Sequence, residues 1–265
     1  MADHDSSSRL RFFRRTSDHP RRRLRRGVYL LPSLFTLGNM FCGYACIVYA
    51  MRNEFETAAP FIGFAFLLDG LDGRIARLTG GESEFGLQFD SLADIISFGV
   101  APAVLSFTWG LSELGRTGWA SGFVYVSAAA MRLARFNSQP AHLGDKRYFI
   151  GMPTPAAAGV VAATIYAWPY PVTGYPGWAT VMVVLVPAAL MVSRIRFRSF
   201  KTINLGWGPS YLPLLGFALF IAFITTEPRL TLPVLAYGYL VSAFIELVFT
   251  RGRAHREEAP PAASG

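Results

Sequence analysis

The sequence predicts an all-α integral membrane protein, a bundle of about eight transmembrane helices with both termini in the cytoplasm. Hydrophobic residues make up 52% of the 265 residues, and the mean hydropathy is +0.34. Apolar stretches long enough to cross a bilayer recur along the chain. Lysine and arginine gather in alternate connections between these stretches, as the positive-inside rule requires. These three observations favour a multi-pass protein of the cell membrane over a soluble domain.

Eight apolar stretches have the length of a membrane-spanning helix. They lie at residues 31–51, 57–78, 86–110, 118–136, 153–170, 177–193, 209–226 and 231–249. Residues 30–250 are therefore expected to form one transmembrane domain. The second, third and fourth stretches carry charged side chains, so we expect these three helices to line a site.

The charge pattern predicts the side of the membrane on which each connection lies. The amino-terminal tail is assigned to the cytoplasm, and the sides then alternate. All of the 25 Lys and Arg residues except Arg52, Arg116 and Arg229 then belong to cytoplasmic segments or to the helix ends beside them. This asymmetry predicts that both termini, and the polar parts of the second and third stretches, face the cytoplasm.

Both ends of the chain are predicted to lie outside the bilayer. Residues 1–29 form a basic tail with nine arginines between Arg9 and Arg26. A nucleic-acid-binding arm has a similar composition. Beside a membrane span we instead expect the tail to attract anionic lipid headgroups and to bind no nucleic acid. Residues 251–265 end in a stretch rich in Pro and Ala, and we expect them to form a disordered cytoplasmic tail.

Four aspartates inside the second and third stretches are the strongest functional signal. An ionised Asp at the centre of a membrane span costs about 2.5–3.5 kcal/mol, so it is retained where something binds it. Asp69 and Asp72 are three residues apart and Asp90 and Asp94 four apart, so each pair lies on one face of its helix. Oxygen ligands suit Mg²⁺ or Mn²⁺, and two facing pairs can hold two such ions. The alternative is a set of helix-capping or water-facing aspartates near the membrane surface.

The same residues form an unbroken motif, D-x-x-D-G-x-x-A-R-x8-G-x3-D-x3-D. Its eight positions are filled by Asp69, Asp72, Gly73, Ala76, Arg77, Gly86, Asp90 and Asp94. The motif resembles the signature of the CDP-alcohol phosphotransferase family. This resemblance implies that all four aspartates bind the metal ions, that Asp94 is also the catalytic general base, and that the enzyme is a homodimer. It also implies a nucleotide site at the four non-acidic motif residues, although Gly86 can equally serve helix packing and a lone Arg77 can be a snorkelling side chain.

Three further segments indicate which branch of the family the chain resembles. Residues 89–102, 132–137 and 149–155 read FDSLADIISFGVAP, RLARFN and FIGMPTP. They resemble the phosphatidylserine synthase branch of the family, which implies CDP-diacylglycerol and L-serine as substrates and phosphatidylserine and CMP as products. Family members that act on glycerol 3-phosphate typically carry Lys after the last Asp, where this chain has Ile95.

Several alternatives to a serine acceptor remain open. The same chemistry with glycerol 3-phosphate or an inositol as acceptor fits the motif. A cation-coupled transporter would also place carboxylates in the membrane, and a non-catalytic lipid-binding or scaffold protein is a third class. Transport would not require the Gly-x-x-Ala-Arg segment.

Two arginines near the end of the fourth stretch are candidate substrate ligands. Arg132 and Arg135 are three residues apart, at the predicted cytoplasmic end and beside the proposed site. A guanidinium group matches a carboxylate or phosphate bidentately, so both are expected to bind substrate. The alternative is that they only anchor the helix at the cytoplasmic surface. The first stretch carries Thr36 and Asn39, to which the sequence assigns no role.

Overall fold

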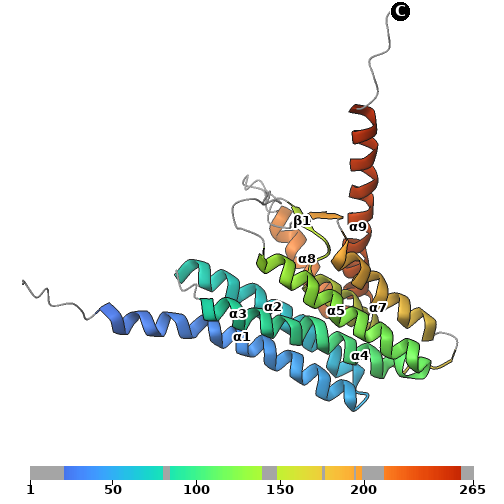
Figure 1. The fold of residues 1–265 in the computed structure, drawn as a ribbon, viewed down its shortest axis with the longest axis horizontal. Coiled ribbons are helices and arrows are strands. Elements are labelled where there is room, and N and C mark those ends of the chain that lie inside the picture. The colour runs from blue at the N-terminus through green and yellow to red at the C-terminus, as the bar shows by residue number, and fades with distance from the viewer. Residues whose placement is uncertain are drawn as a thin grey trace, which may run out of the picture.

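The computed structural model describes residues 21–79, 84–138, 148–174, 177–193, 195–198 and 212–257. Within these ranges the chain is predominantly helical, as predicted (Figure 1). The helices are α1 (Arg21–Met51), α2 (Phe55–Thr79), α3 (Glu84–Asp94), the π-helix η1 (Ile95–Val100), α4 (Ala101–Trp109), the 3-10 helix η2 (Leu111–Leu114), α5 (Arg116–Ser138), α6 (Thr154–Ala167), α7 (Gly177–Val192), α8 (Leu212–Thr226) and α9 (Pro228–Glu257). The strands are β1 (Tyr148–Ile150) and β2 (Arg196–Arg198).

Each of the eight predicted stretches contains helix. The third stretch corresponds to α3, η1 and α4, which together form one uninterrupted helical segment from Glu84 to Trp109. This segment and Ser33–Met51 of α1 are long and apolar enough to cross a membrane by length and composition. The number of crossings and the cytoplasmic location of the termini stay predictions.

The helical ends differ from the predicted boundaries at two places. Helix α1 begins at Arg21, inside the predicted basic tail, and α9 continues to Glu257. Disorder was predicted from residue 251 onwards, and the helix corrects this for residues 251–257. Arg, Ala and Glu are good helix formers, and extending an existing helix requires no new nucleation. Residues 1–20 and 258–265 lie outside the described ranges.

A short antiparallel ladder, which the sequence did not predict, joins β1 to β2. Phe149 lies opposite Phe197 in this ladder. Gly151, directly after β1, has φ +81 and donates its N–H to the Ile195 carbonyl at 2.8 Å. A side chain at Gly151 would also overlap the Met191 carbonyl. The ladder thus ties the start of α6 to the end of α7.

Small residues allow the helices to approach closely. Ala58 and Ala65 of α2, Ala101 of α4 and Ala129 of α5 are buried completely. Gly43 of α1 lies so near η1 that a Cβ there would be 2.5 Å from the Ser97 hydroxyl. Membrane helices characteristically pack through such small residues.

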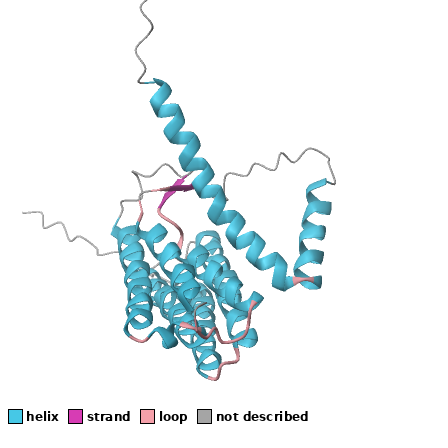
Figure 2. Cartoon of the chain, turned by 90° about the vertical axis from the view of Figure 1, so that its right-hand side faces the viewer, coloured by secondary structure: helices cyan, strands magenta, loops and turns pink. Residues whose placement is uncertain are grey.

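The helices form one main bundle with a separate hairpin beside it. Helices α1 to α5 run side by side (Figure 1), with α6 packed against α2 and α7 packed against α5. Helix α9 packs on α6 and then extends beyond the bundle, and α8 contacts α9 while standing apart from the other helices (Figure 2).

Large apolar side chains are exposed in rows on the outer helix surfaces. Leu34, Leu37, Phe41 and Tyr44 follow one face of α1 with exposed fractions of 48–65%. Soluble monomers rarely expose contiguous apolar surface of this kind. The rows are typical of a surface that faces lipid.

One end of the bundle is closed by polar contacts between helix ends. Trp109 Nε1 at the end of α4 donates to the Trp168 carbonyl after α6 at 2.9 Å. At the same end Arg229 of α9 forms an ion pair with Glu56 of α2, with 2.6 Å between Nη2 and Oε1. Asp69 lies roughly 20 Å further along α2 at the helical rise per residue. The aspartates therefore belong to the opposite end.

Two glycines of α5 offer a matched test of how closely α5 packs against η2. A Cβ at Gly118 would overlap the Leu111 carbonyl oxygen, whereas a Cβ at Gly122 would meet no atom within 4 Å. We expect Gly118→Ala to destabilise the protein by about 1–3 kcal/mol through overpacking. Gly122→Ala is expected to be neutral or to stabilise by up to about 1 kcal/mol, because Ala is the better helix former. Thermal unfolding of both variants in detergent measures the difference, and equal unfolding midpoints would contradict this packing of α5 against η2.

Candidate active site

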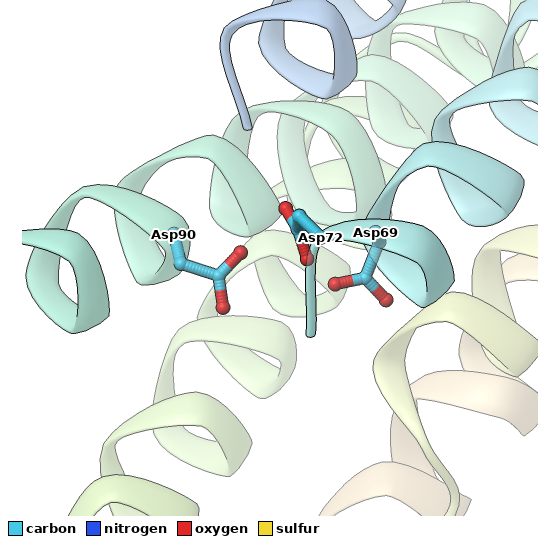
Figure 3. A group of neighbouring side chains, drawn as sticks. All are labelled: Asp69, Asp72 and Asp90. Atoms are coloured by element: carbon cyan, nitrogen blue, oxygen red, sulfur yellow. The ribbon is translucent and has the colours of Figure 1, made fainter. Parts of the chain in front are cut away.

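Three of the four predicted carboxylates converge between α2 and α3. Asp69 and Asp72 lie one turn apart on α2, and Asp90 reaches toward them from α3 (Figure 3). One carboxylate oxygen from each residue lies within 4.8 Å of the others. Asp72 is buried, and the other two are half-buried. The helical spacing that predicted a shared site therefore brings these three side chains together as a carboxylate triad.

The carboxylate triad fits a divalent cation. Three like charges at this distance repel one another strongly in an apolar environment. Asp90 Oδ1 is buried and has no hydrogen-bond partner among the residues that the structure describes, which is unfavourable without a ligand. The donor set consists of carboxylate oxygens, the ligand type that Mg²⁺ and Mn²⁺ prefer.

Asp94, one turn beyond Asp90, does not belong to this triad. It is half-buried at the end of α3. The amide Nδ2 of Asn39 donates a hydrogen bond to Asp94 Oδ1 at 3.1 Å. The charges of Asp69, Asp90 and Asp72 still act on Asp94, so it lies beside the triad without sharing its short oxygen distances.

Helix α1 contributes two side chains to which the sequence assigned no role. Thr36 Oγ1 donates to Asp72 Oδ2 at 3.2 Å, and Asn39 contacts Asp94 one turn later. Ser97 of η1 in turn donates from its hydroxyl to the Asn39 carbonyl at 2.8 Å. The signal available in the sequence was the placement of two polar residues at i and i+3 in an apolar helix, because a buried polar group requires a partner.

The four predicted nucleotide residues lie on α2 and α3. Gly73 directly follows Asp72 and is half-buried, and Gly86 is half-buried one turn before Asp90. Ala76 and Arg77 lie in the last turns of α2, but their side chains fall outside the described part of the structure. Their role in binding a nucleotide stays a prediction.

Arg132 lies with the aspartates, whereas Arg135 is one turn further along α5. The Nη1 of Arg132 donates to Thr154 Oγ1 at the start of α6 at 3.0 Å, and its guanidinium lies 5.7 Å from the centre of the Phe136 ring. The charges of Asp94 and Asp69 act on Arg132. This arrangement places a half-buried cation beside the acidic site. Thr154, its hydrogen-bond partner, had no role predicted from the sequence.

An apolar cavity of about 390 Å³ lies between α2, α6 and α9. Its walls include Ile62 and Phe66 of α2, Ala156 of α6 and Leu235 of α9. Tyr239 of α9 belongs to the wall as well and interacts electrostatically with Arg132. Tyr239 therefore connects the wall of the apolar cavity to the polar site.

Comparison with known protein families identifies a family whose model covers the residues of this site. The model of the CDP-alcohol phosphatidyltransferase family matches residues 29–193, from α1 to the residue after α7. The match contains the four aspartates of the motif, Thr36, Asn39, Arg132 and Thr154. The chain belongs to this family.

Curated relatives support the same family. A Helicobacter pylori protein is 36% identical over 227 residues, which cover 84% of this chain and 92% of the relative. A Mycobacterium leprae protein is 33% identical over 84% of this chain and 76% of its own length, and a Bacillus subtilis protein is 33% identical over 64% and 91%. All three relatives are named CDP-diacylglycerol–serine O-phosphatidyltransferase.

Family membership confirms the resemblance drawn from the motif. CDP-alcohol phosphatidyltransferases are membrane-embedded enzymes that depend on divalent cations. The dependence agrees with the carboxylate triad, in which the buried Asp90 Oδ1 has no hydrogen-bond partner among the described residues. Which ion binds, and how many, stay predictions.

Removing one carboxylate from the triad should have opposite effects with and without metal. We expect Asp90→Asn to raise the apparent unfolding midpoint in EDTA, because one of three repelling charges disappears. The rise in midpoint on adding Mn²⁺ should shrink, because a ligand is lost. For the wild type this rise corresponds to about 2.7 kcal/mol at a free ion concentration 100 times the Kd. Thermal unfolding in detergent with EDTA or Mn²⁺ measures both effects.

Glu84→Gln is the matched control for this prediction. Glu84 is exposed at the start of the same helix α3, so neither midpoint should change. An Asp90→Asn protein that Mn²⁺ stabilises as much as the wild type would show that Asp90 is not a metal ligand.

Proposed function

We propose that this chain transfers the phosphatidyl group of CDP-diacylglycerol to the hydroxyl of L-serine, with phosphatidylserine and CMP as products. The observation that carries the proposal is the activity for which its relatives are named, since they align along most of both chains. This reaction requires metal ligands, a general base and a cation that binds substrate. The carboxylate triad, the adjacent Asp94 and the half-buried Arg132 supply these groups in the proposal.

Asp94 is the general base in this proposal. As the serine Oγ forms its bond to the phosphatidyl phosphorus, the Asp94 carboxylate takes the hydroxyl proton. The bond from the same phosphorus to the oxygen of the CMP phosphate breaks, and CMP leaves with the electron pair. A carboxylate is a weak base, so its placement within hydrogen-bond reach of the attacking hydroxyl has to supply much of the effect.

The carboxylate triad holds the metal in this proposal, two ions of Mg²⁺ or Mn²⁺ per site, with Asp94 as a fourth ligand. When bound, the ions neutralise negative charge on the phosphate oxygens. Asp69 and Asp72 supply oxygens from α2, and Asp90 supplies them from α3. Thr36, which donates to Asp72, orients that carboxylate from α1.

The remaining site residues bind substrate. Gly73 and Gly86 leave room for the cytidine nucleotide to approach the helix backbones, together with Ala76 and Arg77. Arg132, held by Thr154, pairs with the serine carboxylate or the lipid phosphate, with Arg135 as a second cation. The apolar cavity between α2, α6 and α9 supports a substrate that carries acyl chains.

The enzyme in this proposal is a multi-pass protein of the cell membrane with eight spans. Residues 1–29 and 251–265 are its cytoplasmic ends, residues 30–250 its transmembrane domain, and the site faces the cytoplasm. CDP-diacylglycerol enters from the bilayer and serine from the cytoplasm, in a homodimer. The distribution of Lys and Arg supports the sidedness, and the exposed apolar rows support lipid contact.

The assay that tests the reaction uses purified protein in detergent with CDP-diacylglycerol and labelled L-serine. We expect labelled lipid and CMP with Mn²⁺ or Mg²⁺ and neither product in EDTA. Asp94→Asn should lower turnover by about 100-fold or more, because the proton acceptor is lost. Glu84→Gln should leave turnover unchanged.

CMP release with glycerol 3-phosphate or an inositol, but not with serine, would support the family assignment and show that the acceptor alcohol is not serine. Ion-driven substrate flux without CMP release would favour a transporter.

Arg132→Gln tests the proposed serine ligand. We expect the KM for serine to rise about 10–100-fold, as for loss of a charge-assisted hydrogen bond of about 1.5–3 kcal/mol. Thr154→Val should raise it less, because the guanidinium stays but loses one hydrogen bond. Arg116→Gln, at the exposed opposite end of α5, is the control and should not change it. An unchanged serine KM in Arg132→Gln would reject this role.

A further inference from the structure

Helix α1 sends one completely buried amide into the aspartate site. Asn39 is 0% exposed, and its Nδ2 donates to Asp94 Oδ1 at 3.1 Å. An ionised carboxylate only accepts hydrogen bonds, so the NH₂ group of the amide has to be the atom that faces Asp94. The direction of the second amide atom, Oδ1, is fixed by this bond.

Asn39 Oδ1 is buried without a hydrogen-bond partner among the described residues. A buried acceptor that lacks a donor destabilises the folded state, whereas an apolar side chain of similar size does not. The unpaired Oδ1 therefore gives no stability that would explain an asparagine at this position. The interaction that leucine cannot replace is the hydrogen bond to Asp94.

The backbone of Asn39 is held by the segment that carries Asp94. Ser97, three residues after Asp94, is completely buried and donates its hydroxyl to the Asn39 carbonyl at 2.8 Å. Gly43, one turn further along α1, permits this approach because a Cβ there would lie 2.5 Å from Ser97 Oγ. The amide and the carboxylate are thus fixed relative to each other by two hydrogen bonds and a close helix crossing.

We propose that Asn39 is a positioning residue, which orients the Asp94 carboxylate to accept the proton of the attacking alcohol. The inference rests on the proposed function, in which Asp94 is the general base. It assigns the two polar residues of α1 to different parts of the site. Thr36 acts on the carboxylate triad through Asp72, and Asn39 acts on the base.

Asn39→Leu tests this assignment, because leucine has a similar size and removes the donor. We expect turnover in CMP release to fall about 10–100-fold, the usual cost of losing a partner that orients a functional ligand. The KM values for both substrates should stay within about threefold of the wild type, because Asn39 binds neither. The apparent unfolding midpoint should stay close to that of the wild type, because removal of the unpaired acceptor offsets the loss of the hydrogen bond to Asp94.

Ser106→Ala is the matched control. Ser106 is 1% exposed and donates to the Pro102 carbonyl within α4, three turns beyond Asp94. The substitution removes one buried hydroxyl that has no link to the aspartates, so turnover should not change.

A double-mutant cycle measures the contact without any activity. The unfolding midpoints of the wild type, Asn39→Leu, Asp94→Ala and the double mutant are compared in EDTA. Residues in contact should give effects that do not add. Additive effects, turnover of Asn39→Leu within twofold of the wild type, or a loss of turnover matched by a lower midpoint would each overturn the role of Asn39. Absence of CMP release from the wild type would instead overturn the proposed function, and with it the inference.

Discussion

The structure depends on one electrostatic constraint, the gathering of like charges inside an apolar helix bundle. Each carboxylate of the triad is expensive in this environment, and their proximity adds repulsion to the cost of removing them from water. Packing of α1, α2 and α3 has to hold the three side chains together against that repulsion. The small residues at these helix contacts permit it, because they bring the backbones close enough for short polar side chains to meet.

Much of the fold and of the acidic site could be predicted from the sequence, because both depend on local patterns. Apolar stretches of spanning length predicted the positions of the helices, and the intervals of three and four residues predicted which carboxylates share a helix face. The convergence of Asp69, Asp72 and Asp90 results from those intervals once α2 and α3 lie side by side.

The contacts that the sequence did not reveal join residues far apart in the chain. Asn39 and Asp94 are 55 residues apart, and Arg132 and Thr154 are 22 apart, so no local periodicity relates them. The β1–β2 ladder has three residues in each strand, too few for an alternating pattern to be recognised. The sequence also could not predict that Asp94 lies apart from the triad, because Asp90 and Asp94 have the four-residue spacing of side chains on one helix face.

The π-helix η1 has a consequence for how one helix serves two purposes. A π-turn contains an additional residue, so everything after it is rotated about the helix axis relative to an uninterrupted α-helix. Three consecutive residues of η1, Ser97, Phe98 and Gly99, are buried. Ser97 faces α1, and the Phe98 carbonyl accepts from the Tyr125 hydroxyl of α5 at 3.4 Å. The segment before η1 can therefore direct its acidic face into the site, while α4 turns a different face to the core. Deleting a single residue from η1 would leave every site residue in the sequence, but it would rotate α3 relative to α4, so that the two helices could no longer present these faces to the site and to the core.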